Sequence, residues 1–164
     1  MATDTYTDAK VLVGDKTTAL AQLGADLKSG FATYEKTAAD TDGSVLRFFK
    51  DVPVELTLVE CTVMCDAITG CSDTDLGIYL PNGGAELDGN LFMDGQTLAS
   101  ASKVLDGVAA VDVAYRTKTI KELYEAVNST TLDPSIRKVD IALTLNTGGT
   151  NTGTISIRAR AAVQ

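Results

Sequence analysis

Three cysteines are the residues of this 164-residue sequence whose chemistry is most versatile. Cys61, Cys65 and Cys71 could bind zinc as thiolates, but the sequence contains no histidine, so a carboxylate such as Asp66 or Asp73 would have to complete the site. Cys61 and Cys65 are four residues apart, which places both side chains on one face of a strand. We therefore predict reduced, small core residues and no bound metal, with one disulfide as the alternative.

Side chains whose oxygen atoms could bind a metal ion form a second group, between residues 73 and 94. Its members are Asp73, Asp75, Asp88, Asn90 and Asp94. Carboxylates at this density can hold calcium, but their spacing does not match an EF-hand loop. Asp and Asn also bond to the backbone of tight turns, so we expect turn residues here and no cofactor.

Catalytic groups are scarce. Nucleophilic catalysis by serine or cysteine usually needs a neighbouring base, and histidine, the commonest base, is absent. No GxSxG nucleophile elbow occurs. The glycine-containing stretches at 82–84 and 146–153 lack the lysine and the strand-to-helix context of a phosphate-binding loop. The sequence therefore predicts a protein that is not an enzyme and has no catalytic residues.

Charge and hydropathy argue against nucleic acid and membranes as partners. The chain carries 14 basic and 22 acidic residues, a net charge of −8, and no stretch rich in Lys and Arg, so nucleic acid is a poor partner. No run of 18 apolar residues occurs, and the first ten residues are polar and acidic, which is unlike a signal peptide. We expect no membrane association.

From Ser44 onward, apolar residues repeat with a period of two, which is typical of strands. Leu46 and Phe48 share a face in the first of these strands. In the next, residues 54–65, the apolar positions change parity between Leu58 and Val59. Such a change requires a β-bulge or a strand that faces two sheets in turn, and we favour a curved strand shared by two sheets.

The segments after residue 66 mix strands, loops and helices. We expect a strand at 75–80, a long loop at 85–96, a helix or turn at 97–105, a strand at 109–116 and a helix at 119–127. In the last segment, Ile120, Leu123, Tyr124 and Val127 form an apolar stripe, and Thr119 with Glu122 forms a capping box. This helix should close one end of the core.

Two alternating runs near the C-terminus, residues 139–146 and 154–161, are joined by a glycine-rich loop. They predict a β-hairpin whose inward face carries Ile141, Leu143, Ile155 and Ile157. Together with the earlier strands, the pattern predicts a mainly β fold: an antiparallel, jelly-roll-like β-sandwich with one or two short helices and an N-terminal arm.

The first thirty residues lie outside the clear strand pattern. Residues 15–28 have helical spacing, whereas the alternative is a short strand at 9–14 followed by an extended arm. We divide the chain into an N-terminal arm or short helix, 1–30, and a sandwich domain, 31–164. The apolar side chains of the arm are predicted to bind a partner, the alternative being an edge strand of the protein's own sandwich. They are Tyr6, Val11, Leu12 and Val13.

Three segments resemble a group of small virion structural proteins of tailed double-stranded-DNA bacteriophages. They are residues 66–95, residues 119–127 with the Leu-Asp-Pro at 132–134, and residues 139–161. The matching positions are Asp75, Leu76, Gly77, Ile78, Tyr79, Asp88, Phe92, Leu123, Tyr124, Glu125, Asp133, Pro134, Asp140, Ile141, Gly153 and Thr154. The resemblance covers about residues 44–161 and implies a β-sandwich that adheres to a capsid.

This resemblance implies a decoration or cement protein on the capsid surface of the virion, made in the cytoplasm of the host bacterium. Its implied partners are the major capsid protein and neighbouring copies of itself, with a trimer as one form. Two alternatives stay open: a host-glycan-binding module of a head fibre or tail, and a neck or connector component. With five tyrosines, four phenylalanines and no tryptophan, the supply of aromatic rings for sugar stacking is small.

Overall fold

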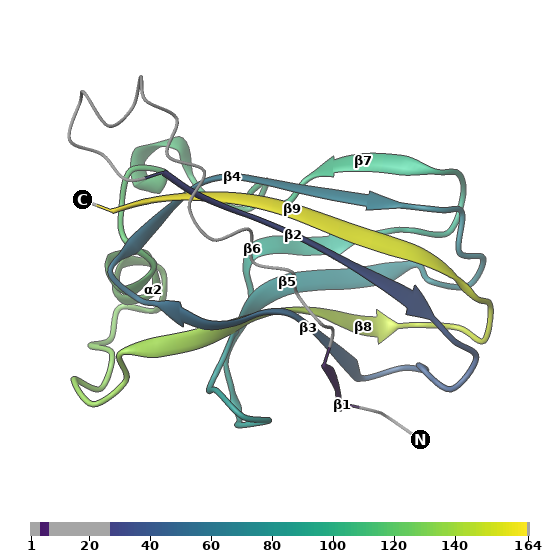
Figure 1. Cartoon of the computed structure of the whole chain (residues 1–164), viewed down its shortest axis with the longest axis horizontal. Coiled ribbons are helices and arrows are strands. Elements are labelled where there is room, and N and C mark those ends of the chain that lie inside the picture. Colours follow the sequence, from purple (N-terminus) through teal and green to yellow (C-terminus); the bar gives the residue numbers. More distant parts are fainter. Residues whose placement is uncertain (1–3, 7–26, 164) are drawn as a thin grey trace.

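Two β-sheets packed face to face make up the architecture (Figure 1). The computed structural model describes residues 4–6 and 27–163. The strands are β1 (Asp4–Tyr6), β2 (Leu27–Lys36), β3 (Ser44–Pro53), β4 (Leu56–Cys65), β5 (Asp73–Tyr79), β6 (Glu86–Gln96), β7 (Lys103–Asp106), β8 (Lys138–Thr147) and β9 (Gly153–Val163). A five-stranded sheet has the order β1-β3-β8-β5-β6, and a four-stranded sheet has the order β2-β9-β4-β7. The predicted antiparallel β-sandwich is confirmed, with β1 as a parallel edge strand.

The hydrophobic core lies between the two sheets. The four side chains predicted to face inward from 139–161 are buried: Ile141, Leu143, Ile155 and Ile157 are each at most 2% exposed. Leu46 and Phe48 of β3 are also completely buried. A bulge in β3 additionally brings Phe49 into register with Ile141, so Phe49 joins the core.

The predicted hairpin of 139–146 and 154–161 is wrong. β8 pairs with β3 and β5 in one sheet, whereas β9 pairs with β2 and β4 in the other. The loop between β8 and β9 therefore crosses from sheet to sheet, and the two strands face each other across the core. Alternation determines which side chains point inward, but it does not determine which strand supplies the backbone hydrogen bonds.

The buried side chain of Lys36, at the end of β2, fastens this crossing loop. Its Nζ donates hydrogen bonds to the carbonyl oxygens of Gly149, at 3.1 Å, and Asn151, at 2.8 Å. Gly149 has a φ of 59°, and an added Cβ there would lie 2.9 Å from the backbone of Gly70. The glycines of this loop thus serve a close backbone contact.

The change of parity in β4 is a β-bulge. The register between β4 and β9 shifts between Leu58 and Glu60, and the extra residue, Val59, is 52% exposed. In the described residues β4 belongs to the four-stranded sheet alone, so the predicted strand shared by two sheets is wrong. A local bulge reverses the side-chain parity without moving the strand to another sheet.

The loop predicted at 85–96 is the strand β6, which pairs with β5. Its register is irregular: Leu76 lies opposite Met93, but Ile78, two residues on, lies opposite Asp88. The extra residues of β6 bulge out, and they break the alternation that would have revealed a strand in the sequence.

Two further predictions between residues 97 and 116 are wrong. The predicted helix or turn at 97–105 includes the start of strand β7, and the predicted strand at 109–116 consists of turns and the 3-10 helix η1 (Val113–Tyr115). Asp112 caps η1 by accepting a hydrogen bond from the backbone N–H of Ala114. Val111 is buried while Val113 is 81% exposed, so the apolar alternation here does not mark one face of a strand.

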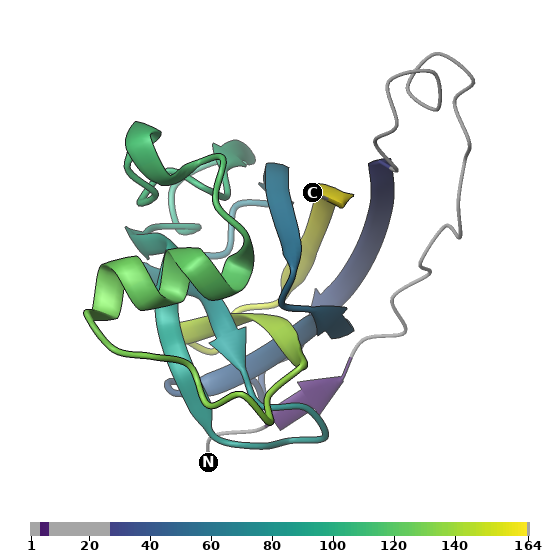
Figure 2. The ribbon, with the colours of Figure 1, turned by 90° about the vertical axis from the view of Figure 1, so that its left-hand side faces the viewer.

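Helix α2 (Ile120–Asn128) lies at one end of the sandwich, as Figure 2 shows. The predicted capping box is confirmed: the Thr119 side chain accepts from the backbone N–H of Glu122, whose carboxylate accepts from the backbone N–H of Thr119. Ile120 and Leu123 are buried, whereas Val127 is 52% exposed. The helix therefore buries a narrower stripe than its sequence predicts.

The predictions for residues 9–14 and 15–26 lie outside the described residues. Leu27 and Lys28, the end of the predicted helix at 15–28, belong to strand β2, which pairs with β9 along its whole length. The division of the chain at residue 30 stays a prediction, with β2 beginning inside the range assigned to the arm.

Candidate functional site

The predicted partner-binding residues fall at the N-terminus. The backbone of Tyr6 lies in β1, an edge strand that pairs in parallel with β3 and places Tyr6 opposite Arg47. Val11, Leu12 and Val13 lie outside the described residues. The role of these four residues therefore stays a prediction.

The outer face of the five-stranded sheet holds a buried ion pair between Arg47 of β3 and Asp140 of β8. Arg47 Nη1 lies 3.2 Å from Asp140 Oδ2, and both side chains are at most 2% exposed. The other oxygen of Asp140 accepts a hydrogen bond from the backbone N–H of Asp51. A charge buried this deeply needs several partners, and each member of this pair has more than one.

Arg47 also fixes the turn between β5 and β6. Its Nη1 donates to the carbonyl oxygen of Leu80, at 3.0 Å, and its Nη2 donates to that of Gly84, at 2.8 Å. Asn82 and Gly83, at the tip of the turn, both have positive φ, as a tight hairpin turn with Asn-Gly requires. The turn thus folds back over the outer face and helps to cover it.

Tyr79 lies beside Arg47, with the guanidinium carbon 5.1 Å from the ring centre. The Tyr79 hydroxyl is hydrogen-bonded to Thr144 and to the Glu86 carboxylate. Burial raises the pKa of Tyr79 to about 12, with the nearby Glu86 carboxylate adding to the shift. The tyrosine is therefore neutral at physiological pH and has a packing role.

Gly77 explains the Asp-Leu-Gly-Ile-Tyr segment at 75–79. An added Cβ on Gly77 would lie 2.0 Å from the carbonyl oxygen of Asp88 and 2.3 Å from the carbonyl carbon of Gly89. The bulged part of β6 thus lies directly on the β5 backbone.

Sequence reasoning did not single out Arg47, although an arginine inside the apolar run Ser-Val-Leu-Arg-Phe-Phe was a signal for a buried charge.

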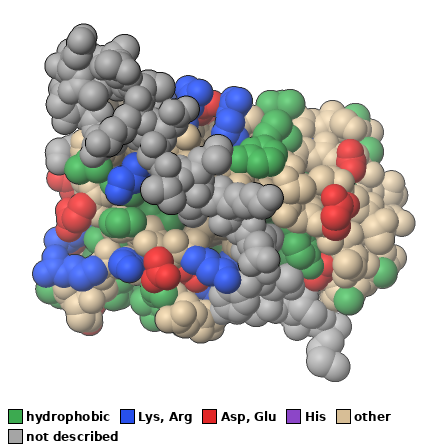
Figure 3. Space-filling model, in the orientation of Figure 1, with side chains coloured by type: hydrophobic (Ala, Val, Ile, Leu, Met, Phe, Trp, Pro, Cys, Tyr) green, Lys and Arg blue, Asp and Glu red, His purple; other side chains and the backbone are tan. Residues whose placement is uncertain are grey.

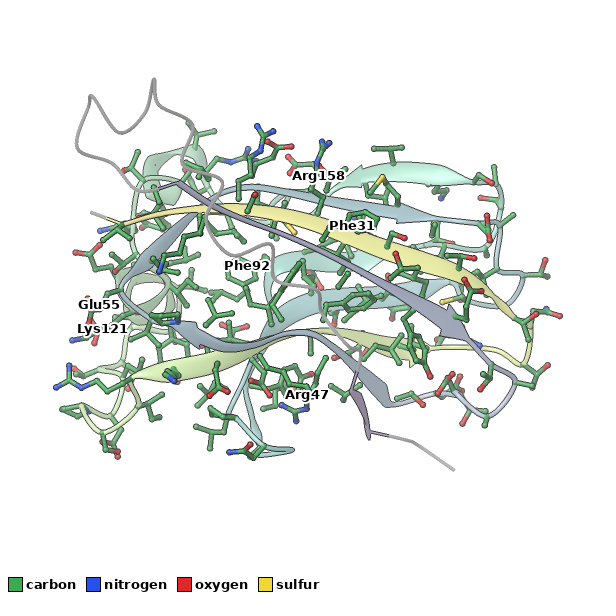
Figure 4. The ribbon with its side chains drawn as sticks, in the orientation of Figure 1. Phe31, Arg47, Glu55, Phe92, Lys121 and Arg158 are labelled. Atoms are coloured by element: carbon green, nitrogen blue, oxygen red, sulfur yellow. The ribbon has the colours of Figure 1, made fainter. Side chains whose placement is uncertain are left out.

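The outer face of the four-stranded sheet differs, because large apolar side chains are exposed on it. One row across the sheet runs Phe31, Arg158, Thr62 and Asp106, and the neighbouring row runs Thr33, Ser156, Met64 and Val104. Phe31 is 43% and Val104 is 74% exposed. Figure 3 shows this apolar surface, and Figure 4 shows Phe31 and Arg158 on the neighbouring strands β2 and β9.

Charges border these apolar residues. Glu60 of β4 accepts from both Arg158, at 3.0 Å, and Arg160, at 3.2 Å. Each arginine side chain is 49% exposed. A single carboxylate therefore pairs with two guanidinium groups, so this cluster has one more positive than negative charge, although the net charge of the chain is −8.

A groove of about 220 Å³ opens between β2 and β3. Its lining is mainly apolar and includes Phe49, Leu56 and Ile141, with Lys28 and Lys50 also contributing. Pockets for small organic ligands usually have volumes of roughly 300–1,000 Å³. The groove is therefore small for a cofactor or metabolite.

The acidic group at 73–94 lies within strands rather than in the tight turns that the sequence predicts, with Asp73 and Asp75 in β5 and Asp88, Asn90 and Asp94 in β6. The Asp75 carboxylate accepts from the Gly95 N–H at 2.8 Å and from the Asn146 side chain at 2.6 Å. Asp88 accepts from the Asn90 N–H and from the Asn128 side chain. In the part of the chain that the structure describes, no group of three or more acidic, cysteine or histidine side chains has the geometry of a metal site.

The three cysteines are buried with free thiols, and Cys61 and Cys65 lie on the inward face of β4, which confirms their prediction as core residues. Burial raises the pKa of Cys61 to about 12 and that of Cys71 to about 11. Because a thiol is nucleophilic and binds metal as the thiolate, these protonated cysteines are poorly suited to either role.

No helix within the described residues is long and apolar enough to cross a bilayer.

Known proteins were compared with the chain by sequence and by structure. No model of a protein family matches the sequence, and no curated protein matches it. Two solved structures contain a chain of similar fold. In the capsid of Ralstonia phage GP4 the match has a TM-score of 0.61 and 16% identity, covering 98% of this chain and 97% of that chain. In the capsid asymmetric unit of cyanophage Pam1 it has a TM-score of 0.52 and 10% identity, covering 85% and 86%.

These likenesses define the class of fold. At such low identity, the shared property is the arrangement of the strands, and the capsid origin belongs to the two compared structures. The chain is thus a β-sandwich of a kind that also occurs in two phage capsids.

Proposed function

We propose that this protein is a structural protein of a tailed-phage virion that binds the outside of the capsid shell as a decoration or cement protein. The observation that carries the proposal is the match to a chain of the Ralstonia phage GP4 capsid, because it covers nearly the full length of both chains. The sequence motifs around Gly77, Tyr124 and Asp140 point independently to the same class of protein.

The chemistry of the described residues supports a role in binding. The cysteine thiols are buried and protonated, the carboxylates of Asp75 and Asp88 accept hydrogen bonds from neighbouring backbone and amide groups, and the groove between β2 and β3 is small for a cofactor. What the chain offers instead is a closely packed sandwich with two large apolar side chains, Phe31 and Val104, exposed on one outer sheet face. A protein of this kind stabilises a shell by binding its assembled form, since each bound copy adds its binding free energy to the assembled state.

The proposed partners are the major capsid protein and neighbouring copies of this chain. The N-terminal segment contributes to attachment through Tyr6, Val11, Leu12 and Val13, which would be buried against a capsid subunit by strand addition or side-chain packing. Replacing Val11, Leu12 and Val13 by serine leaves the β1 residues intact. The proposal predicts unchanged thermal unfolding of this variant and weaker co-sedimentation with capsids.

The main test is to add the purified protein to shells assembled without it. Saturable binding and a raised temperature of shell disruption are expected, and a shell that neither binds the protein nor gains stability would reject the proposal. Copy number in purified virions distinguishes the alternatives. Hundreds of copies indicate a shell protein, whereas about a dozen indicate a neck component, because the two locations differ in symmetry.

A further inference from the structure

We propose that the outer face of the four-stranded sheet is the surface that contacts the capsid protein, and this inference rests on the function proposed above. We call this surface the Phe31 face. It consists of Phe31, Thr33, Glu60, Thr62, Met64, Val104, Asp106, Ser156, Arg158 and Arg160.

The two outer faces of the sandwich differ in how far their side chains are buried. On the five-stranded sheet, Arg47, Tyr79 and Asp140 are buried, and the turn between β5 and β6 is bound to Arg47. On the four-stranded sheet, Phe31 and Val104 remain exposed. An outer sheet face in contact with water normally carries polar side chains, so exposed large apolar residues on it favour contact with another protein.

Phe31 and Val104 lie on the two edge strands of this sheet, β2 and β7, and Met64 of β4 lies beside Val104. The row that contains Phe31 is adjacent to the row that contains Met64 and Val104. Most of the remaining positions in these two rows are threonine and serine, whose short side chains project only a little way from the backbone of the sheet. A partner can therefore approach this part of the sheet closely, and the Phe31 ring can insert into a hollow of the partner as an anchor.

Charge indicates the chemistry of the partner. Arg158 and Arg160 share the single carboxylate of Glu60 and are each half exposed. An additional carboxylate would find unused guanidinium donors here, since each guanidinium has five N–H groups. We therefore expect a capsid-protein surface with an apolar hollow for Phe31 and an Asp or Glu side chain beside it.

The area of the face favours a shell protein over a second free copy as the partner. Four strands spaced about 4.8 Å apart and on average roughly 9 residues long give the whole outer face of the sheet an area on the order of 500 Å². A standard stable interface buries about 800 Å² on each partner. The Phe31 face alone is thus small for a dimer in solution, whereas it is large enough for one of several contacts that a copy makes on a shell.

The test compares three variants in binding to shells assembled without this protein. Phe31→Glu places a charge at the anchor position, and Arg158→Glu reverses the charge beside it. Val127→Glu is the matched control, because Val127 is exposed on α2, away from the face. Binding is measured by co-sedimentation, and folding of each variant is checked by circular dichroism and thermal unfolding. Phe31→Ser and Arg158→Gln replace any variant that does not fold.

We expect at least a tenfold loss of affinity for the Phe31 and Arg158 variants and wild-type affinity for Val127→Glu. If the wild-type protein binds shells and folded Phe31 variants bind equally well, the Phe31 face is not the contact, while the proposed function stands. If the wild-type protein does not bind shells, both proposals fail. If sedimentation velocity shows instead that Phe31→Glu abolishes self-association and leaves shell binding intact, the occupant is a second copy and the inference is overturned.

Discussion

The guanidinium of Arg47 and the carboxylate of Asp140 form an ion pair at 3.2 Å on neighbouring strands, and both side chains are almost completely buried. Arg47 extends this pair to the carbonyl oxygens of Leu80 and Gly84. One arginine therefore joins the centre of the five-stranded sheet to the turn that covers it. Such a group stabilises the fold only while all its partners are present.

Replacing Arg47 by methionine should lower the free energy of unfolding by roughly 3–5 kcal/mol, because it leaves the Asp140 carboxylate buried without its cation. Urea unfolding measures this change. The double variant Arg47→Met, Asp140→Leu should be more stable than the single variant, since it removes the uncompensated charge. A single variant as stable as the wild type would show that the pair is not closed off from water.

Gly77→Ala should destabilise the protein or displace β6, because the new methyl group would overlap the backbone at Asp88 and Gly89. Overpacking of this kind typically costs about 1–3 kcal/mol, and backbone atoms have little freedom to move away. Gly95→Ala is a useful comparison, since open space surrounds Gly95 and only its positive φ of 61° opposes the substitution. Thermal unfolding of both variants should show the larger loss for Gly77→Ala.

Leu143→Ala should cost about 2–5 kcal/mol, the usual range for truncating a buried leucine. Leu143 is completely buried between Leu46 and Leu76 of the flanking strands. Val127→Ala, at an exposed position on α2, is the control and should change stability by less than about 0.5 kcal/mol. If Leu143→Asp folded normally, the inward orientation of β8 would be wrong.

Stability should fall as the pH rises from about 9 toward 12, because burial raises the pKa of Cys61 from 9.0 to about 12. In this window the unfolded chain releases the thiol proton while the folded chain retains it, so the folded state binds more protons and higher pH favours unfolding. Urea midpoints at several pH values measure the slope. Cys61→Ala should show a shallower decline, and an identical slope would mean that Cys61 does not contribute.

Local signals were the most dependable part of the sequence. The capping box at Thr119 and Glu122 joins residues three positions apart, so the sequence contains the whole interaction, and α2 was predicted to within about one residue of its bounds. The inward side chains of β8 and β9 were also predictable, because alternation follows directly from strand geometry.

Predictions that depended on distant partners were the ones that failed. The pairing of β8 with β3 and β5 involves residues far away in the sequence, and a glycine-rich loop is compatible with a hairpin or with a crossing between sheets. The bulges of β6 hid a strand for a related reason, since Gly89 and its neighbours take their conformation from contact with Gly77. The Phe31 face could not be predicted from the sequence, because the exposure of Phe31 depends on the register of β2 with β9.

The position of β9 between β2 and β4 has a consequence for synthesis on the ribosome. Strand β2 is made early, but its partner in the sheet is β9, more than a hundred residues later in the chain. Until residues 153–163 have emerged, β2 lacks the one strand that pairs with it in the described part of the chain, and the ten residues that include Phe31 stay exposed to other nascent chains. Folding of the four-stranded sheet is therefore expected to wait for β9 and to be slow, with molecular chaperones having their largest effect before β9 is in place.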